Sequence, residues 1–382
     1  MHPEPFKIAI PDADIARLRQ RLRDAIWPGD FNNETGRYGL NEAWLRTAVG
    51  YWRDEFDWRK AEAEMNRFPH YRVVIDDVPI HYIHLRSKRK NATPLIITHG
   101  WPWSFWDWKD VIEPLANPDS DSLPAFDVVV PSLPGFTFST PLRTPGIDMH
   151  EVARRWRTLM QDVLGYGRFA AAGGDWGSLV SAQLGHEFPE DLTGVHLTLP
   201  LMPGIALEQL EDVQFLPEEQ WMADRIVEAR PLIVSHMTVH TTDPQTLAYG
   251  LADSPIGLAA WLWERRLAWS DSRYENPARQ LPWLCTLASL YWFTNCIGSS
   301  LRIYAEHFSR PWAAARKGKQ TIDVPTGFVI APKELAMMPR QMAAAHCNLT
   351  RWTVAPRGGH FIPAEAPDVV VREYQAFFGK LA

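Results

Sequence analysis

The segment Gly173-Gly174-Asp175-Trp176-Gly177-Ser178 decides how this chain folds. A short apolar run, Arg168-Phe-Ala-Ala-Ala172, precedes it and predicts a buried strand. The residues that follow, Leu179 to Leu184, predict the first turns of a helix. Strand, glycine-bounded turn and helix in this order form a nucleophile elbow, in which small residues allow a strained backbone and expose one side chain. That side chain belongs to Asp175.

The aspartate at the tip of this turn sets the chemistry open to the chain. Lipases and esterases carry serine at such a turn, whereas a carboxylate attacks an electrophilic sp3 carbon, such as an epoxide or halide carbon, and forms an alkyl ester. Water can then attack the carbonyl of Asp175 and release an alcohol. The alternative is that Asp175 only caps the following helix or forms an Asx turn. The rest of the chain has to decide between these two interpretations.

The composition is that of an ordinary globular protein. The chain has 382 residues, of which 46% are hydrophobic and 22% charged, and its length predicts a core domain with insertions. The net charge of -6 argues against a general nucleic-acid binder. Cys285, Cys296 and Cys347 are too few for a disulfide scaffold and lack metal-ligand spacing, so we expect a reduced, cytoplasmic setting.

Targeting and membrane segments are not expected. The first 30 residues carry Asp12, Asp14 and several arginines without an apolar stretch, which argues against a signal peptide. No run approaches the ~20 apolar residues of a membrane span. The chain has instead 18 tryptophans and 31 prolines. Tryptophan supplies large, rigid apolar surface, so we expect these residues in the core, between domains and around an apolar pocket.

Strand and helix patterns predict an α/β fold in four consecutive parts. Residues 1–66 are expected to form a helical segment wrapped around the core, and residues 67–205 the first part of that core. Residues 206–310 show helical spacing without a clear strand, which predicts an inserted helical cap, and residues 311–382 complete the core.

Short, nearly all-apolar runs predict a mostly parallel central sheet. The expected strands are Tyr71–Ile75 and Pro79–His84 as a hairpin, then Pro94–Thr98, Phe126–Val130, Gly194–Leu199, Val324–Ile330 and Leu349–Val354. The expected helices include one from Pro11 with Ile15, Leu18 and Leu22 on one face, Glu42–Trp52, Leu258–Leu267, Pro282–Phe293 and Asp368–Phe378. Asp368 is expected to cap the last helix.

A hydrolase that uses Asp175 needs a base, and His360 is the candidate. It lies in Arg357-Gly-Gly-His-Phe361, just past a predicted strand, where glycines let a loop bring the imidazole to the elbow. Glu334, directly after the strand before it, is the candidate that orients the base, ahead of Asp323 and Glu365. The order nucleophile, acid, histidine is that of α/β-hydrolases. The alternatives are a surface-loop histidine and an exposed loop glutamate.

The oxyanion hole is expected from His99-Gly-Trp-Pro102, which follows the strand ending at Thr98. In an elbow enzyme, an N–H from such a loop and the N–H after the nucleophile point at the same oxygen. The backbone N–H groups of Trp101 and Trp176 are therefore the predicted donors. The alternative is a strand-ending turn packed with tryptophan.

Together, His99-Gly-Trp-Pro102, Gly174-Asp-Trp-Gly177, Arg357-Gly-Gly-His360 and the helical N-terminal segment resemble the microsomal-type epoxide hydrolases. The likeness runs over nearly the whole chain in the right order, and the motifs are jointly specific. The family includes juvenile-hormone and fungal enzymes, as well as bacterial ones of enediyne antibiotic pathways. No membrane anchor of the family kind is present, which implies a soluble, bacterial-type member, and the enediyne group is one candidate assignment.

The resemblance implies the α/β-hydrolase fold and a two-step reaction without cofactor or metal. Asp175 opens the epoxide and forms a glycol ester, and His360, oriented by Glu334, activates water to hydrolyse it. The family protonates the epoxide oxygen with two cap tyrosines, and Tyr304 matches one of them. His236 stands where the other is expected and becomes the candidate donor.

The position of the second cap tyrosine stays open to two further residues, since Tyr249 or Tyr291 can fill it after a local shift. A cationic His236 would be the stronger acid, because histidine has a reference pKa of ~6.5 against ~10 for tyrosine. His236 and His240 lie four residues apart, but no third ligand accompanies them, so no metal is expected.

The leading hypothesis is a cofactor-independent epoxide hydrolase that acts on a bulky or aryl epoxide with water, in detoxification or secondary metabolism. Trp101, Trp176 and Phe136 are expected to line its pocket between cap and core. Its competitors are a haloalkane dehalogenase, which would need halide-binding donors, and a silent binding protein, which would show a broken triad. No nucleic-acid partner or membrane anchor is expected, and family likeness makes a homodimer the expected assembly.

Overall fold

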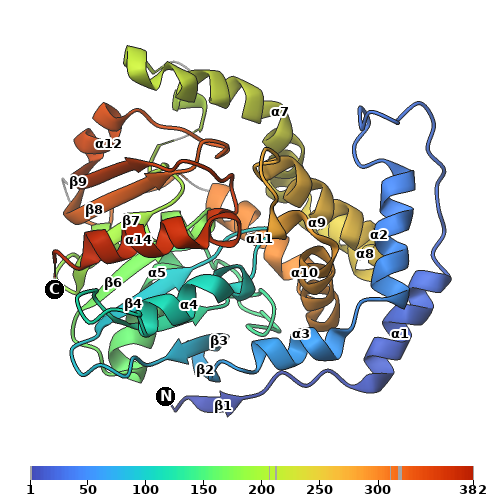
Figure 1. Cartoon of the computed structure of the whole chain (residues 1–382), viewed down its shortest axis with the longest axis horizontal. Coiled ribbons are helices and arrows are strands. Elements are labelled where there is room, and N and C mark those ends of the chain that lie inside the picture. The colour runs from blue at the N-terminus through green and yellow to red at the C-terminus, as the bar shows by residue number, and fades with distance from the viewer. Residues whose placement is uncertain (1, 206, 211–212, 310, 317–320, 382) are drawn as a thin grey trace.

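The computed structural model describes residues 2–205, 207–210, 213–309, 311–316 and 321–381. Its centre is one nine-stranded sheet with the order β1-β2-β3-β5-β4-β6-β7-β8-β9 (Figure 1). The strands are β1 Glu4–Phe6, β2 His70–Ile75, β3 Val78–Leu85, β4 Thr93–Thr98, β5 Phe126–Pro131, β6 Phe169–Gly173, β7 Leu192–Leu197, β8 Ile322–Ile330 and β9 Cys347–Val354. An α/β-hydrolase fold with a mostly parallel sheet was predicted, and this prediction is confirmed.

The sheet changes from antiparallel to parallel along its width. β1, β2, β3 and β5 pair antiparallel, and every pairing from β5 through β4 and β6 to β9 is parallel. The predicted hairpin forms between β2 and β3, and its turn residues Asp76 and Asp77 both adopt positive φ, as a tight two-residue turn requires. β6 is buried at every residue, which explains its apolar run without alternation.

Helices cover both faces of the parallel strands. In Figure 1, α14 and α4 cross the face towards the viewer, and α5, which packs against α6, lies behind the sheet. These helices are α4 Lys109–Ala116, α5 Met149–Thr158, α6 Trp176–Glu187 and α14 Pro367–Phe378. The predicted apolar stripe of the last helix is confirmed, because Val370, Tyr374 and Phe378 are all buried. The predicted cap is wrong: α14 begins at Pro367, and Asp368 pairs with Arg372 instead.

The N-terminal segment runs along the lower and right edges of the molecule in Figure 1. Its helices are α1 Asp12–Arg23, α2 Glu42–Asp54 and α3 Trp58–Met65. Trp52 of α2 donates its indole N–H to Ser289 Oγ at 2.9 Å and packs against Trp263 with ring centroids 5.6 Å apart. The segment also adds β1 to the sheet edge, which was not predicted because three residues carry no periodicity.

A helical insertion lies between β7 and β8 in the chain. Its long helices are α7 Gln220–Thr242, α8 Pro244–Asp253, α9 Pro255–Trp269, α10 Leu281–Thr294 and α11 Ile297–Phe308. In Figure 1, α8 to α11 lie beside the sheet, on the side where the N-terminal helices also pack, and α7 runs along the top of the view, above β8 and β9. The stretches predicted as helical, Leu258–Leu267 and Pro282–Phe293, fall within α9 and α10.

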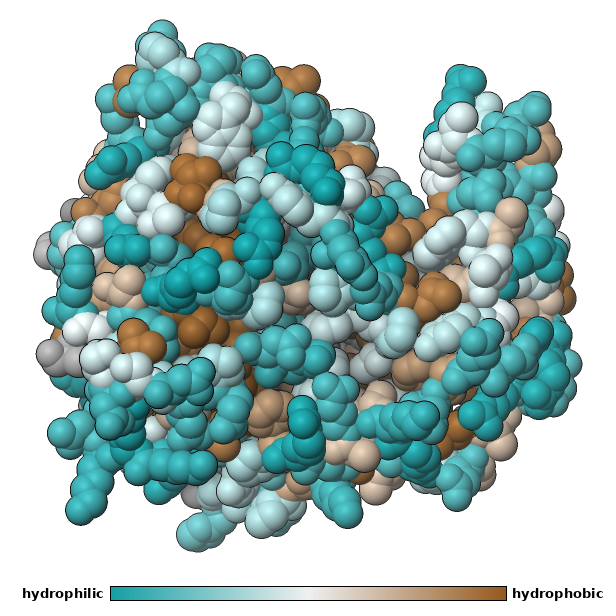
Figure 2. Space-filling model, viewed as in Figure 1, coloured by the Kyte–Doolittle hydropathy of each residue, from teal (hydrophilic) through white to brown (hydrophobic). Residues whose placement is uncertain are grey.

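Several tryptophans are fully buried. Those among the largest fully buried side chains are Trp101, Trp103, Trp108, Trp156, Trp263 and Trp269. On the face shown in Figure 2, hydrophobic residues form small separate areas within a largely hydrophilic surface. Within the described ranges, no helix has both the length and the apolar character to cross a membrane.

Candidate active site

Asp175 lies in the strained turn that the sequence predicts. β6 ends at Gly173 and α6 begins at Trp176, so Asp175 is the second of the two residues between strand and helix. Its backbone angles are φ 54° and ψ −126°, a conformation that a residue with a side chain adopts only at an energetic penalty. Asp175 makes no side-chain capping bond to α6. The alternative of a simple helix cap is therefore excluded, and the carboxylate is free for another partner.

His360 and Glu334 meet Asp175 at the carboxyl edge of the parallel strands. Glu334 follows β8 and His360 follows β9, and the imidazole bridges the two carboxylates. Nδ1 of His360 donates to Glu334 Oε1 at 2.5 Å, and Nε2 lies 3.2 Å from Asp175 Oδ2. Arg225 of α7 donates to the backbone carbonyl oxygen of Glu334 at 2.8 Å and so holds the loop after β8. The predicted trio thus has the geometry of nucleophile, base and orienting acid.

The environment of His360 favours its cationic form. His360 is 1% exposed, and burial alone lowers its pKa. The charge of Glu334 and the contact with Asp175 outweigh burial and raise the pKa of His360 to about 10. The two carboxylates therefore favour an imidazolium in the resting site.

The loop after β4 supplies one of the two predicted oxyanion donors. The backbone N–H of Trp101 donates to Asp175 Oδ1 at 2.8 Å. Gly100 makes this approach possible, because a Cβ there would lie 2.0 Å from the same oxygen. The N–H of Trp176, the second predicted donor, opens α6, where helix geometry leaves the first N–H groups without an intrahelical partner. It donates no hydrogen bond to Asp175 within the described part of the chain.

The insertion places Tyr304 and His236 above this centre. Tyr304 of α11 is 2% exposed, and its ring packs edge-on against Trp176 and Trp101 with centroids 4.8 and 6.1 Å apart. Burial, reinforced by Asp175, raises the pKa of Tyr304, so its phenol stays protonated and can donate. His236 of α7 stacks on Trp101 at 5.5 Å and lies 5.6 Å from the Tyr304 ring.

His236 is neutral rather than cationic. Burial lowers its pKa well below the ordinary value, and His240, Arg265 and His360 add to this effect. The stronger acid considered from the sequence is therefore not present, and His236 can act only as a neutral donor. The two alternatives are also excluded: Tyr249 is 71% exposed, and the hydroxyl of the buried Tyr291 donates to the carbonyl of Trp103 at 2.8 Å.

Comparison with known proteins connects this geometry with one family. Residues 3–108 match the model for the epoxide hydrolase N terminus, and residues 93–367 match the α/β hydrolase fold. A protein of Stigmatella aurantiaca (strain DW4/3-1), provisionally named an epoxide hydrolase, is 37% identical over 99% of this chain and 85% of its own length. The chain belongs to the epoxide hydrolase family.

Two further relatives match nearly the whole of this chain. Epoxide hydrolase 1 of Oryctolagus cuniculus is 31% identical over 98% of this chain and 88% of its own length. The solved structure of Aspergillus niger epoxide hydrolase superposes with a TM-score of 0.85 at 30% identity, over 100% of this chain and 97% of that one. The chain is thus a hydrolase enzyme, as the sequence predicted, whereas its assignment to the enediyne group stays a prediction.

Two residues near the proposed site were not predicted from the sequence to be part of it. Trp269 packs against His236 and His360 with ring centroids 4.8 and 5.3 Å apart. His240 accepts the indole N–H of Trp261 at 3.1 Å and lies 4.8 Å from the Tyr304 ring. Both lie on helices of the insertion, and no pattern in the sequence shows which face of these helices meets the elbow. Among the described residues, no group of three or more histidine, cysteine, aspartate or glutamate side chains is arranged so that it could hold a metal ion.

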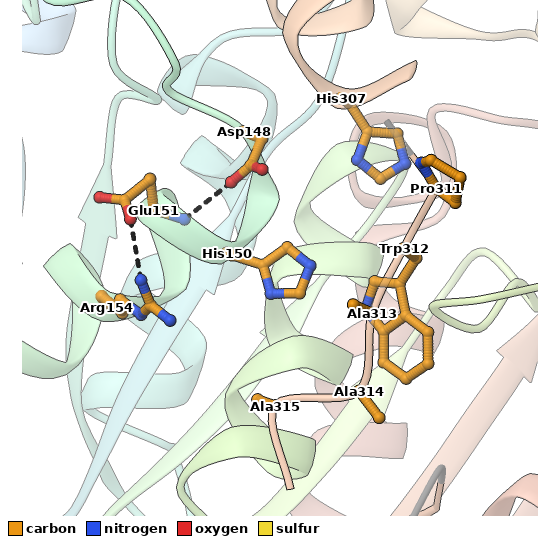
Figure 3. Close-up of a pocket in the computed structure, with 10 residues that line it drawn as sticks. All are labelled: Asp148, His150, Glu151, Arg154, His307, Pro311, Trp312, Ala313, Ala314 and Ala315. Atoms are coloured by element: carbon orange, nitrogen blue, oxygen red, sulfur yellow. Dashed lines mark hydrogen bonds and ion pairs between the residues drawn. The ribbon is translucent and has the colours of Figure 1, made fainter. Parts of the chain in front are cut away.

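Two cavities of this hydrolase are lined by residues other than Asp175, Glu334 and His360. The larger, about 680 Å³, separates the loop 134–147 from α11. The smaller, about 350 Å³, lies between α5 and the segment Pro311–Ala315, with His307 at its edge (Figure 3). His307 packs against Trp176 with ring centroids 5.1 Å apart, which places one edge of this cavity next to Trp176.

The sequence predicts a pocket between cap and core that is lined by tryptophan and phenylalanine. Neither of the two cavities is lined by Trp101, Trp176 or Phe136. Phe136 is fully buried against His99 and Tyr291, with ring centroids 5.3 and 6.5 Å away. Its contact with substrate therefore stays a prediction.

Proposed function

We propose that this enzyme hydrolyses an epoxide to a vicinal diol through a covalent ester on Asp175. The observation that carries the proposal is that the two oxygens of Asp175 have different contacts. Oδ1 accepts the Trp101 N–H at 2.8 Å, whereas Oδ2 lies on the side of His360, 3.2 Å from Nε2. Oδ2 is therefore the attacking oxygen, and Oδ1 becomes the ester carbonyl oxygen in the oxyanion hole.

In the first step, Oδ2 forms a bond to one epoxide carbon while the carbon–oxygen bond of the ring breaks. The electron pair stays on the epoxide oxygen, which takes a proton from Tyr304, and His236 supplies a second hydrogen bond. Ester formation removes the negative charge of Asp175 that helps to hold the imidazolium. The pKa of His360 then falls, and its proton can return to the phenolate of Tyr304.

In the second step, neutral His360 acts as the base. Nε2 takes a proton from water, and the hydroxide attacks Cγ of Asp175 while Trp101 and Trp176 donate to the developing oxyanion. The ester bond breaks, the leaving alkoxide takes the remaining proton of the attacking hydroxide, the diol leaves, and the carboxylate and imidazolium are restored. Glu334, which is fully buried, holds the ring in the required tautomer throughout.

The side chains around the reacting atoms favour a bulky apolar or aryl epoxide. Trp101, Trp176 and Trp269 present aromatic surface next to Tyr304 and His236. A phenolic donor favours an oxygen leaving group over a halide, which supports an epoxide rather than a haloalkane substrate. A silent binding protein would not need a strained nucleophile in contact with a complete trio.

The test is a single turnover of a styrene-oxide-type substrate in heavy-oxygen water. We expect a diol together with one heavy oxygen in the peptide that contains Asp175, because the hydroxide attacks the carboxyl carbon. A diol that carries all of the label, with an unlabelled peptide, would show direct attack of water on the epoxide and refute the ester route. Absence of diol with several aryl and alkyl epoxides would refute the proposed substrate class.

A further inference from the structure

The loop that carries His360 is bonded to the helical insertion through its backbone. The N–H of His360 donates to the carbonyl of Trp269 at 2.9 Å, and the N–H of Gly358 donates to Asp271 Oδ2 at 3.1 Å. The fit is tight at Gly359, where a Cβ would lie 2.5 Å from the Trp269 carbonyl oxygen. The base therefore comes from the core, but the backbone around it is fixed by the insertion.

One carboxylate joins both sides of this contact. Glu365 lies in the short helix α13 Ile362–Glu365, and its Oε2 and Oε1 accept the N–H groups of Gly359 at 3.0 Å and Phe361 at 2.9 Å. The same Oε2 accepts the N–H of Asp271 at 2.7 Å and the side-chain amide of Asn276 at 2.8 Å. Two of its donors thus flank the catalytic histidine, and the other two belong to the insertion.

A buried ion pair contacts the residue that follows His360. Arg266 of α9 lies over the Phe361 ring, 3.7 Å from its centroid, and pairs with Asp107 at 2.7 Å. Arg266 and Asp107 are 0% and 1% exposed. Phe361 therefore cannot move without disturbing a desolvated charge, whereas the loop bonds that Glu365 accepts can be removed by one substitution.

We propose that Glu365 is a positioning residue that locks the His360 loop to the insertion, so that Nε2 is held for the hydrolysis of the ester. The proposal rests on the two-step function given above. Formation of the ester needs Asp175 and a donor to the epoxide oxygen, but only hydrolysis needs an imidazole aimed at water. Loss of the Glu365 bonds should therefore slow the second step more than the first.

Glu365→Gln keeps the shape of the side chain but turns one oxygen into an N–H₂ group. If the remaining oxygen keeps the three donors on the Oε2 side, the new donor faces the N–H of Phe361, directly beside His360. Glu365→Ala removes all four acceptor contacts. Misplacement of a catalytic group by about 1 Å can slow a reaction roughly 100-fold, so we expect the hydrolysis rate constant to fall about 10-fold in the Gln variant and about 100-fold in the Ala variant.

The matched control is Glu62→Gln. Glu62 is also a largely buried glutamate with several donors, namely the Ile10 N–H, the Trp58 indole and the Arg59 guanidinium, but these all belong to the N-terminal segment. The experiment is a rapid-quench single turnover of a styrene-oxide-type substrate, in which mass analysis of the Asp175 peptide follows the ester with time. Thermal unfolding of each variant records its stability.

The expected result is that both Glu365 variants form ester at a rate within about threefold of the parent enzyme and accumulate it, whereas Glu62→Gln hydrolyses it normally. Equal slowing of both steps, or no accumulation of ester in the folded Gln variant, would overturn the positioning role. Failure of the parent enzyme to form any ester would instead reject the two-step function, and with it this proposal.

Discussion

Replacement of Gly100 by alanine tests whether the nucleophile needs the close approach of the loop after β4. A Cβ at this position would lie 2.0 Å from Asp175 Oδ1, 2.3 Å from its Cβ and 2.4 Å from its Cγ. Ordinary contacts of this kind begin at 3.4 Å, so the carboxylate and the loop must separate by about 1.4 Å. Gly100 does not adopt positive φ, so the backbone itself accepts alanine.

A displacement of this size should affect the nucleophile and its oxyanion donor together. Since about 1 Å of misplacement can cost roughly 100-fold in rate, we expect kcat/KM to fall at least about 100-fold, equivalent to about 3 kcal/mol in activation free energy. Formation of the ester should slow as much as overall turnover, unlike in the Glu365 variants. Initial rates with an aryl epoxide and the rapid-quench measurement of the Asp175 ester provide the two readouts.

Gly50→Ala is the matched control for this substitution. Gly50 lies within α2, and a Cβ there would meet no atom within 4 Å. Alanine is the better helix former, so this variant should keep full activity and gain about 0.5–1 kcal/mol of stability. If Gly100→Ala folds and turns over within about threefold of the parent enzyme, the tight apposition of loop and nucleophile has no catalytic importance and our reasoning about the oxyanion loop is wrong.

Three further predictions concern a buried histidine, a buried ion pair and the proposed donor His236. Burial lowers the pKa of His196 to about 3. As pH falls below about 6.5, the unfolded chain therefore takes up a proton on this residue before the folded chain does, and stability is lost. His196→Phe should reduce the fall in melting temperature between pH 6.5 and 4. Arg266→Met leaves Asp107 buried without its partner and should destabilise the fold by about 3–5 kcal/mol, whereas the double variant with Asp107→Asn should lose less, as measured by urea unfolding. Because burial favours neutral His236, His236→Tyr exchanges one neutral donor for another and should keep activity within about 10-fold and the same pH profile. The variant should change which epoxide carbon receives the water oxygen. Unchanged regiochemistry with aryl epoxides would remove His236 from the mechanism.

The local part of the site could be predicted because each of its residues lies at a break between elements that the sequence punctuates. The glycines around Asp175 and His360, and the strand ends before Trp101 and Glu334, mark turns whose chemistry depends on a few adjacent residues. The parallel order of the strands then brings all four turns to one edge of the sheet, since a sequence that alternates buried strands and helices folds in few other ways.

What only the tertiary structure decided is the part of the site that the insertion supplies. The sequence of α7 and α9 gives no register relative to the elbow, so the aromatic wall of Trp269 and the neutral state of His236 follow from how these helices pack. The sequence offers Glu365 only as a weaker alternative to Glu334, yet Glu365 accepts bonds from both the His360 loop and the insertion. Turns are encoded by neighbouring residues, whereas burial, charge state and shared hydrogen bonds depend on which distant surfaces meet, and those are set by the packing of the whole chain.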